Sequence, residues 1–134
     1  MIAFDTDTGD ARKLDRVLSV LSLRRARFVC YYVKTDHNIE LNELYLAREV
    51  AAWETGTDPS QVGTEKVFAV LSELQEDLLP DLDETGLVAY DRGNGSVRYG
   101  DPPEPFAQLL GVCQSVEHPG HRWPRGDADG DASD

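Results

Sequence analysis

Few residues of this 134-residue chain have the types and spacing that metal chemistry requires. Cys113, His118 and His121 are three potential metal ligands, but they enclose a Pro-Gly step and lack a second cysteine pair. Residues 127–131 alternate aspartate with small residues as a calcium loop does, yet the glycine is misplaced and no glutamate follows to close the site. We therefore expect no metal site and no cofactor.

Patterns typical of enzymes are also missing from the sequence. No glycine-rich phosphate loop follows a strand pattern, no nucleophile elbow occurs, and no histidine lies in the predicted core to act as a base. We expect that the chain is not an enzyme.

Contact with nucleic acid is the chemistry that the polar and basic side chains of the second half could perform. Hydroxyl and ammonium groups can hydrogen-bond to base edges, and guanidinium groups bind phosphate. The candidates are Thr64, Lys66, Ala69 and Ser72 for the major groove, and Arg92 and Arg98 for phosphate or the minor groove. Each basic residue also has an interpretation without DNA. Lys66 could be a solvated residue in the first helical turn, and the two arginines could pair with acids on a hairpin.

The groove candidates lie on a predicted helix that begins at Thr64, its expected N-cap. Its apolar face repeats at helical spacing and consists of Val67, Leu71, Leu74 and Leu78. Pro80 lacks a backbone donor, so the helix should kink or restart near Leu79 and then end at Gly86.

Two short β-prone segments follow that helix, residues 87–90 and 96–99. The Gly/Asn/Asp loop between them tolerates positive φ, which favours a hairpin. A helix that leads directly into a hairpin is typical of a winged helix-turn-helix. The predicted fold class is mainly α with a small β-hairpin wing (α+β), with four core helices and a short C-terminal helix, a recognition helix at about residues 64–79 and a wing at residues 87–99.

The first half of the chain predicts the remaining helices. The first helix is marked by Leu14, Val17, Leu18 and Leu21, which follow the i, i+3, i+4 and i+7 spacing of an amphipathic helix. Ser22 is the expected cap of a second helix at residues 23–35, residues 39–41 could form a short strand, and Asn42 should cap a third helix that ends at residue 53 or 54. Helical spacing favours the core over base stacking for the aromatic residues Tyr31, Tyr32 and Trp53.

We predict four regions along the chain. Residues 1–11 form a flexible arm, 12–100 the winged-helix domain, 101–117 a Pro-rich spacer with a short amphipathic helix, and 118–134 a disordered acidic tail. No run of about 18 apolar residues and no signal-peptide pattern occurs, so we expect a soluble cytoplasmic protein with no membrane partner. Cys30 and Cys113 are expected to remain thiols.

Charge separates the first third of the chain from the rest. The net charge is −12, from 13 Lys and Arg against 25 Asp and Glu. The Lys-poor, Asp-rich bias favours a saline cytoplasm, where salt shortens the screening length to about 3 Å at 1 M, over an ordinary acidic protein of low salt. Residues 12–34 nevertheless carry a net charge of +6. Their secondary basic patch consists of Arg12, Arg24, Arg25 and Arg27, which could bind acids of neighbouring helices, nucleic acid or a partner.

Three blocks, residues 23–32, 47–56 and 79–91, resemble a family of small haloarchaeal winged-helix domains of unknown function. The order of elements also resembles that of the ArsR/MarR-like transcriptional regulators. The resemblance covers about residues 14–99 and implies a winged helix-turn-helix that regulates transcription in a halophilic archaeon. The chain departs from the family at residues 75–78 and at Asp81, where it is acidic.

Two functions therefore stay open. Residues 64–85 carry a net charge of −6, which opposes approach to phosphate. The first function is a DNA-binding regulator whose homodimer is formed by the first helix or by the Phe106 to Val116 segment. The second is a protein–protein interaction module with a winged-helix core and no DNA binding. If the arginines of the secondary basic patch lie on the same side as Lys66 and Arg92, DNA binding is favoured. If they face acids or a partner, the interaction module is favoured.

Overall fold

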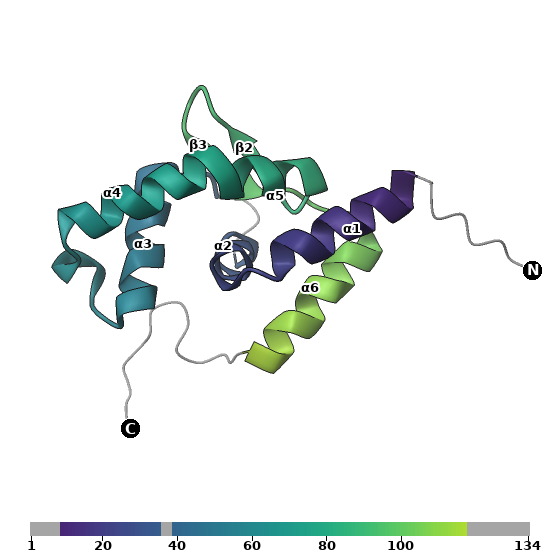
Figure 1. Cartoon of the computed structure of the whole chain (residues 1–134), viewed down its shortest axis with the longest axis horizontal. Helices are drawn as coiled ribbons and strands as arrows, with labels where there is room; N and C mark the ends of the chain where they lie inside the picture. Colours follow the sequence, from purple (N-terminus) through teal and green to yellow (C-terminus); the bar gives the residue numbers. More distant parts are fainter. Residues whose placement is uncertain (1–8, 36–38, 118–134) are drawn as a thin grey trace, which may run out of the picture.

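The structure is a computed structural model that describes residues 9–35 and 39–117. Along the chain lie α1 (Gly9–Leu21), α2 (Arg24–Lys34), β1 (Leu41–Asn42), α3 (Glu43–Thr55), η1 (Pro59–Gln61), α4 (Thr64–Glu73), η2 (Leu74–Leu78), α5 (Leu79–Thr85), β2 (Val88–Asp91), β3 (Ser96–Tyr99) and α6 (Glu104–Glu117), as Figure 1 shows. The predicted tail and residues 1–8 of the predicted arm lie outside the described residues. Because α1 begins at Gly9, the prediction that the arm reaches residue 11 is wrong.

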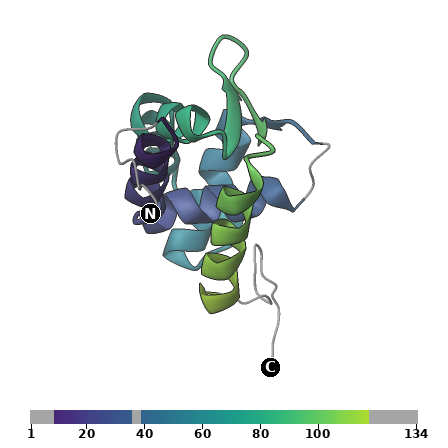
Figure 2. The same cartoon turned by 90° about the vertical axis from the view of Figure 1, so that its right-hand side faces the viewer.

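Helix α2 passes through the middle of the molecule, and α1, α3 and α6 surround it (Figures 1 and 2). Six of its eleven residues are buried, as expected for a helix enclosed on several sides. Ser22 is not its cap: the Ser22 hydroxyl donates to the carbonyl oxygen of Ser19 at the end of α1, at 2.6 Å. Leu23 precedes α2 without a side-chain cap, so that prediction is wrong.

Helix α1 buries a narrower face than predicted. Val17 and Leu21 are buried together with Val20, but Leu14 and Leu18 are exposed. The contacts of α1 are made mainly with α2 and α5, so the flank that carries Leu14 and Leu18 has no element over it among the described residues.

Helix α3 begins where the sequence predicts. The Asn42 carboxamide oxygen accepts hydrogen bonds from the backbone N–H of Leu44 at 2.7 Å and of Tyr45 at 3.4 Å, so the predicted cap is confirmed. Gly56 ends α3 in the left-handed conformation at φ 70°.

Helix α4 continues through η2 into α5 as one long bent helix. Its N-cap is Gly63, and Thr64 is the first helical residue, so the predicted cap is wrong by one position. η2 is a π turn in which the Leu79 N–H bonds to the Leu74 carbonyl five residues earlier. Pro80 lies just after this turn and has no N–H, which explains why the α-helical pattern is interrupted here. The predicted restart near Leu79 is confirmed.

The sheet has three antiparallel strands in the order β1-β3-β2. The predicted hairpin is β2 and β3, in which Val88 is paired with Tyr99 and Asp91 with Ser96. The strand predicted at residues 39–41 is shifted to Leu41–Asn42, where it pairs with the other side of β3. The fold class is therefore α+β, mainly helical with a small sheet.

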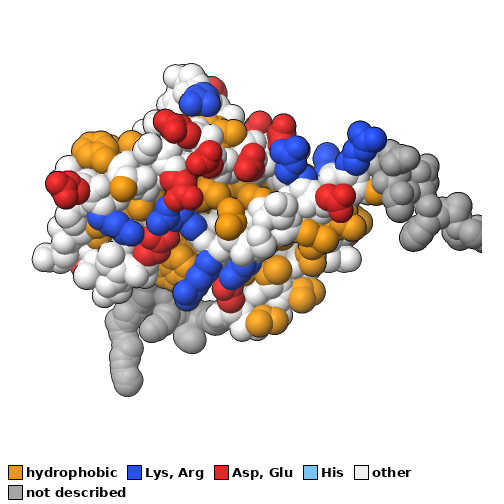
Figure 3. Space-filling model, in the orientation of Figure 1, with side chains coloured by type: hydrophobic (Ala, Val, Ile, Leu, Met, Phe, Trp, Pro, Cys, Tyr) orange, Lys and Arg blue, Asp and Glu red, His pale blue; other side chains and the backbone are white. Residues whose placement is uncertain are grey.

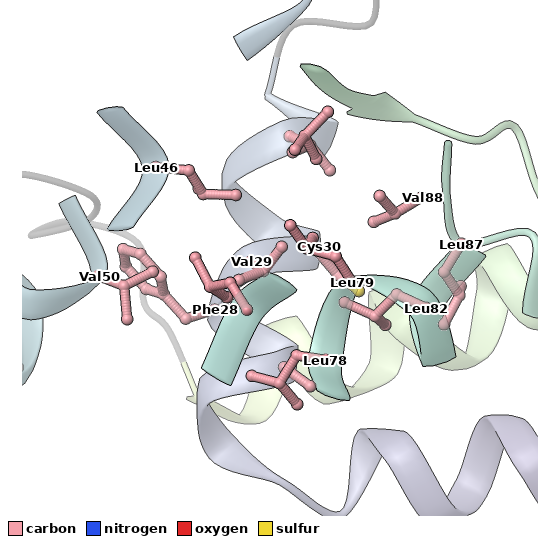
Figure 4. Close-up of a cluster of buried hydrophobic side chains, with 14 of the residues drawn as sticks. Phe28, Val29, Cys30, Leu46, Val50, Leu78, Leu79, Leu82, Leu87 and Val88 are labelled. Atoms are coloured by element: carbon pink, nitrogen blue, oxygen red, sulfur yellow. The ribbon is translucent and has the colours of Figure 1, made fainter. Parts of the chain in front are cut away.

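Helix α6 is longer than predicted and belongs to the folded unit. Its Leu110 is fully buried, and α6 packs on α2. Figure 4 shows the core, where α2 supplies Phe28, Val29 and Cys30, α3 supplies Leu46 and Val50, and η2 and α5 supply Leu78, Leu79 and Leu82. Leu87 and Val88 close the core beneath the hairpin.

Candidate nucleic-acid interface

The outer side of α4 carries the predicted groove residues. α3 and α4 pack on each other with η1 between them, and α4 turns Val67 and Val70 inward. As a consequence Thr64, Ala69 and Ser72 are exposed. These small side chains leave the backbone of α4 open to close approach by a ligand.

Lys66 is half-buried and already has a partner. Its ammonium group donates to Glu54 on α3 at 3.1 Å. Arg25 on α2 binds the same carboxylate through two nitrogens, at 2.5 and 2.6 Å, and also binds Glu73 on α4. We call Arg25, Glu54, Lys66 and Glu73 the ion cluster.

The ion cluster holds Glu54 in its charged form. Burial acts to raise the pKa of Glu54, but the hydrogen bonds from Arg25 and Lys66 outweigh it and hold that pKa below its usual value. Phosphate would therefore have to compete with a carboxylate for the Lys66 ammonium group.

The hairpin carries the predicted phosphate ligands. Arg92 and Arg98 are exposed, and neither forms a salt bridge with any residue that the structure describes. Figure 3 shows a basic side chain at the outer end of the hairpin. The turn is shaped by Asp91, whose carboxylate accepts from the Asn94 backbone N–H at 3.3 Å and from the Asn94 side chain at 2.7 Å.

Glu43 fixes the hairpin to the helices, a role that sequence reasoning missed. Its carboxylate accepts from the Tyr90 hydroxyl at 2.8 Å and from the Gln75 amide at 2.7 Å, and its backbone N–H donates to the Gly95 carbonyl at 2.8 Å. Burial, followed by the bond to Glu43, raises the pKa of Tyr90 to about 12. No local sequence signal joins positions 43, 75, 90 and 95, because the sheet pairing and the packing of η2 on α3 bring them together.

Acids share the surface with these candidates. Glu65, Glu76 and Asp77 are exposed on α4 and η2, and Figure 3 shows carboxylates spread along this helix. One large apolar side chain, Phe68, lies among them with 54% of its surface exposed.

The secondary basic patch is not a single surface. Arg27 binds Glu117 of α6 at 2.9 and 3.0 Å, and Arg24 lies over the Trp53 ring at 5.1 Å. Arg25 is on the same side as Lys66, since both bind Glu54, but the acids of the ion cluster neutralise it. Arg12 is exposed at the start of α1. Arg16, absent from the predicted patch, pairs with Glu84 and, at 4.0 Å, with Asp81.

Aromatic and sulfur side chains fill the core. Phe28 stacks on Trp53 with ring centroids 4.2 Å apart and on Tyr32 at 5.8 Å, which agrees with the predicted core role. Cys30 is buried, which raises the pKa of its thiol to about 12, and Cys113 is half-buried; both are free thiols among the described residues.

The predicted metal candidates His118 and His121 lie outside the described residues. Within the described residues no group of three His, Cys, Asp or Glu side chains is arranged to hold a metal. No helix in the described part of the chain has the length and apolarity needed to cross a membrane.

Comparison with protein families matches residues 18–98 to a domain of unknown function, DUF7344. The matched region runs from the last turn of α1 into β3 and contains every groove and phosphate candidate. Neither the search of curated proteins nor the search of solved structures found a match.

Proposed function

We propose that this chain, which belongs to the DUF7344 family of domains of unknown function, is a winged helix-turn-helix protein that binds DNA and regulates transcription. The observation that carries the proposal is the path of the chain. One helix, a short strand, two packed helices and a hairpin follow in sequence, and the first strand pairs beside the hairpin in the order β1-β3-β2. This arrangement holds the hairpin next to the continuous helix of α4, η2 and α5, and among the described residues the outer side of α4 is exposed.

In the proposed complex α4 enters the major groove. Its exposed Thr64, Ala69 and Ser72 are small enough to let the helix approach base edges, and the hydroxyl groups can hydrogen-bond to them. The hairpin then lies on the sugar-phosphate backbone, where Arg92 and Arg98 bind phosphate. Glu43 links the hairpin to η2, the turn that continues α4.

The surrounding carboxylates determine the conditions for binding. A net charge of −12 repels DNA at low salt, and this repulsion weakens as the Debye length falls to about 3 Å at 1 M salt. If two arginines per copy neutralise phosphate, the logarithm of the binding constant falls by only about 2 per tenfold rise in salt. We therefore propose that the protein works in a saline cytoplasm, through a few direct contacts.

Selection of duplexes from a random pool at 2 M KCl tests the proposal. We expect an enriched sequence motif. In fluorescence anisotropy, Arg92→Ala combined with Arg98→Ala should weaken binding to all duplexes about equally, whereas Ser72→Ala or Lys66→Ala should change the preferred sequence. Arg12→Ala is the matched control, because Arg12 is also exposed but lies at the start of α1. Equal binding by wild type and the double variant would refute the hairpin contact.

A protein–protein interaction module is the second candidate, favoured by one observation. Arg16, Arg25, Arg27 and Lys66 all pair with acids of this chain, and the outer side of α4 combines carboxylates with the exposed Phe68. Such a surface suits a basic partner protein with an apolar pocket. No enrichment of any duplex, at either 0.2 or 2 M KCl, would favour this candidate over DNA binding.

A further inference from the structure

The outer side of α4 carries a row of exposed side chains of different chemistry. Four of them follow helical spacing, and we call them the α4 stripe: Glu65, Phe68, Ala69 and Ser72. Their spacing of i, i+3, i+4 and i+7 places them on one face of the helix. A ligand that lies along α4 therefore meets a carboxylate, an aromatic ring, a methyl group and a hydroxyl group together.

The charged side chains beside the α4 stripe are held by other helices. Lys66 is the only basic residue of α4, and its ammonium group donates to Glu54 of α3 at 3.1 Å. Glu73 accepts from Arg25 of α2. Glu65, by contrast, forms no ion pair with any residue that the structure describes. The stripe therefore offers a free hydrogen-bond acceptor and an apolar ring, and no free positive charge.

Phe68 is isolated from other exposed apolar groups. With 54% of its surface exposed, it is the only large apolar side chain of α4 and η2 that is exposed in the described chain. Anchors of protein–protein interfaces usually lie within a larger apolar patch. A single ring between small or polar side chains is better suited to a small apolar group that is itself surrounded by polar atoms.

The base edges in the major groove differ in the groups that they present. Thymine presents its C5 methyl group, on which phenylalanine can pack, and cytosine presents an N4 amino group, from which a carboxylate can accept. Guanine presents the acceptors O6 and N7, which Arg or Lys usually binds. A carboxylate repels these acceptors. The chemistry of the α4 stripe therefore matches pyrimidines and disfavours guanine.

We propose that the α4 stripe reads pyrimidines: Phe68 packs on the methyl group of a thymine, and the Glu65 carboxylate accepts a hydrogen bond from the N4 amino group of a cytosine. This inference rests on the proposed function, because it requires α4 in the major groove. The two residues are three positions apart, about 4.5 Å along the helix. Since base pairs are stacked about 3.4 Å apart, the thymine and the cytosine lie within about two base pairs of each other.

Replacement of thymine by deoxyuridine removes only the methyl group and tests the Phe68 contact. The duplex selected by the wild-type chain at 2 M KCl is synthesised with deoxyuridine at each thymine in turn, and binding is followed by fluorescence anisotropy. At one thymine we expect the affinity to fall about fourfold, the factor for one methyl group that is no longer withdrawn from water. Phe68→Ala should abolish this sensitivity. Leu18→Ala should retain it, and is the matched control because Leu18 is 48% exposed but lies on α1.

Base-pair substitution tests the Glu65 contact. Replacing the contacted C·G pair by T·A puts the acceptor O4 in the place of the amino donor, and should weaken wild-type binding about tenfold. Glu65→Gln should reduce this discrimination, because an amide can donate as well as accept. Glu104→Gln is the matched control, since Glu104 is also exposed in the first turn of a helix but belongs to α6.

The outcomes distinguish pyrimidine readout from the function on which it rests. If no duplex is enriched, both DNA binding and pyrimidine readout are refuted, and Phe68 becomes the candidate contact for a partner protein. If a duplex is enriched but binds equally well with deoxyuridine at every thymine, pyrimidine readout is overturned while DNA binding stands. The same holds if Phe68→Ala keeps the sensitivity to deoxyuridine, or if Glu65→Gln leaves the discrimination at every C·G pair unchanged. The deoxyuridine series uses the wild-type chain, so it does not depend on the folding of a variant.

Discussion

Glu54 is the carboxylate on which two cations of the candidate interface converge. Arg25 reaches it from α2 and Lys66 from α4, so one side chain of α3 holds three helices together. The sequence leaves open whether the arginines of the first third pair with acids of neighbouring helices or form a surface for nucleic acid or a partner; in the structure Arg25 and Arg27 pair with acids. It could not reveal which acids, because Glu54 and Glu117 become partners only through the packing of distant helices.

The ion cluster should make the free energy of unfolding decrease as the pH falls into the acid range. The pKa of Glu54 is lowered in the folded state relative to about 4.3 in the unfolded chain, so its contribution is present above that value and is lost as pH falls through the lowered pKa. Glu54→Gln should cost about 1–2 kcal/mol at pH 7 and reduce the loss of stability between pH 5 and pH 3. Urea unfolding at several pH values measures both effects, and an unchanged pH profile would contradict this role of Glu54.

At the scale of elements, the sequence predicts best where a local rule decides the outcome. Asn42 caps α3 and Pro80 follows the interruption near Leu79, because capping and the missing N–H act within one helical turn. The sequence predicts burial less well where the elements packed against a helix determine which side chains are covered. Leu14 and Leu18 share a helical pattern with Val17, but which part of a pattern is buried depends on what packs over it.

The joint between β3 and the end of α5 depends on close backbone contact. A Cβ atom added to Gly100 would lie 2.3 Å from the carbonyl oxygen of Gly86, whereas one added to Gly111 of α6 meets nothing within 4 Å. Gly100→Ala should therefore lower the free energy of unfolding by more than about 2 kcal/mol, because backbone must move. Gly111→Ala should raise it by about 0.5–1 kcal/mol, because glycine weakens a helix interior. Chemical denaturation compares the two, and equal effects would exclude the steric explanation.

For the whole molecule, the order of apolar patterns along the chain predicts the fold class. The distribution of charge over the surface, by contrast, could not be predicted from counts of charged residues. The net charge of +6 on residues 12–34 predicts an island of positive charge, yet in the structure three of its seven basic residues, Arg16, Arg25 and Arg27, pair with acids contributed by α3, α4, α5 and α6. Pairing between elements distant in sequence cannot be read from net charge along the chain.

Salt should stabilise this protein. Residual repulsion at a net charge of −12 favours expansion, and raising KCl from 0.1 M to 2 M shortens the Debye length from about 10 Å to below about 3 Å. We expect the Tm to rise across this range in thermal unfolding followed by circular dichroism. A falling Tm would mean that the loss of salt bridges through screening outweighs the relief of repulsion.

The continuous helix formed by α4, η2 and α5 joins regions that are far apart in the sequence. It lies against α3 at its beginning, and against α1 and β2 at its end. Opening of α3 would expose the beginning of this helix, and opening of α1 or β2 would expose its end, so the helix couples the opening of the helical half to that of the sheet. Its inward amides should be among the slowest to exchange with solvent, and they should exchange together, as a single cooperative unit.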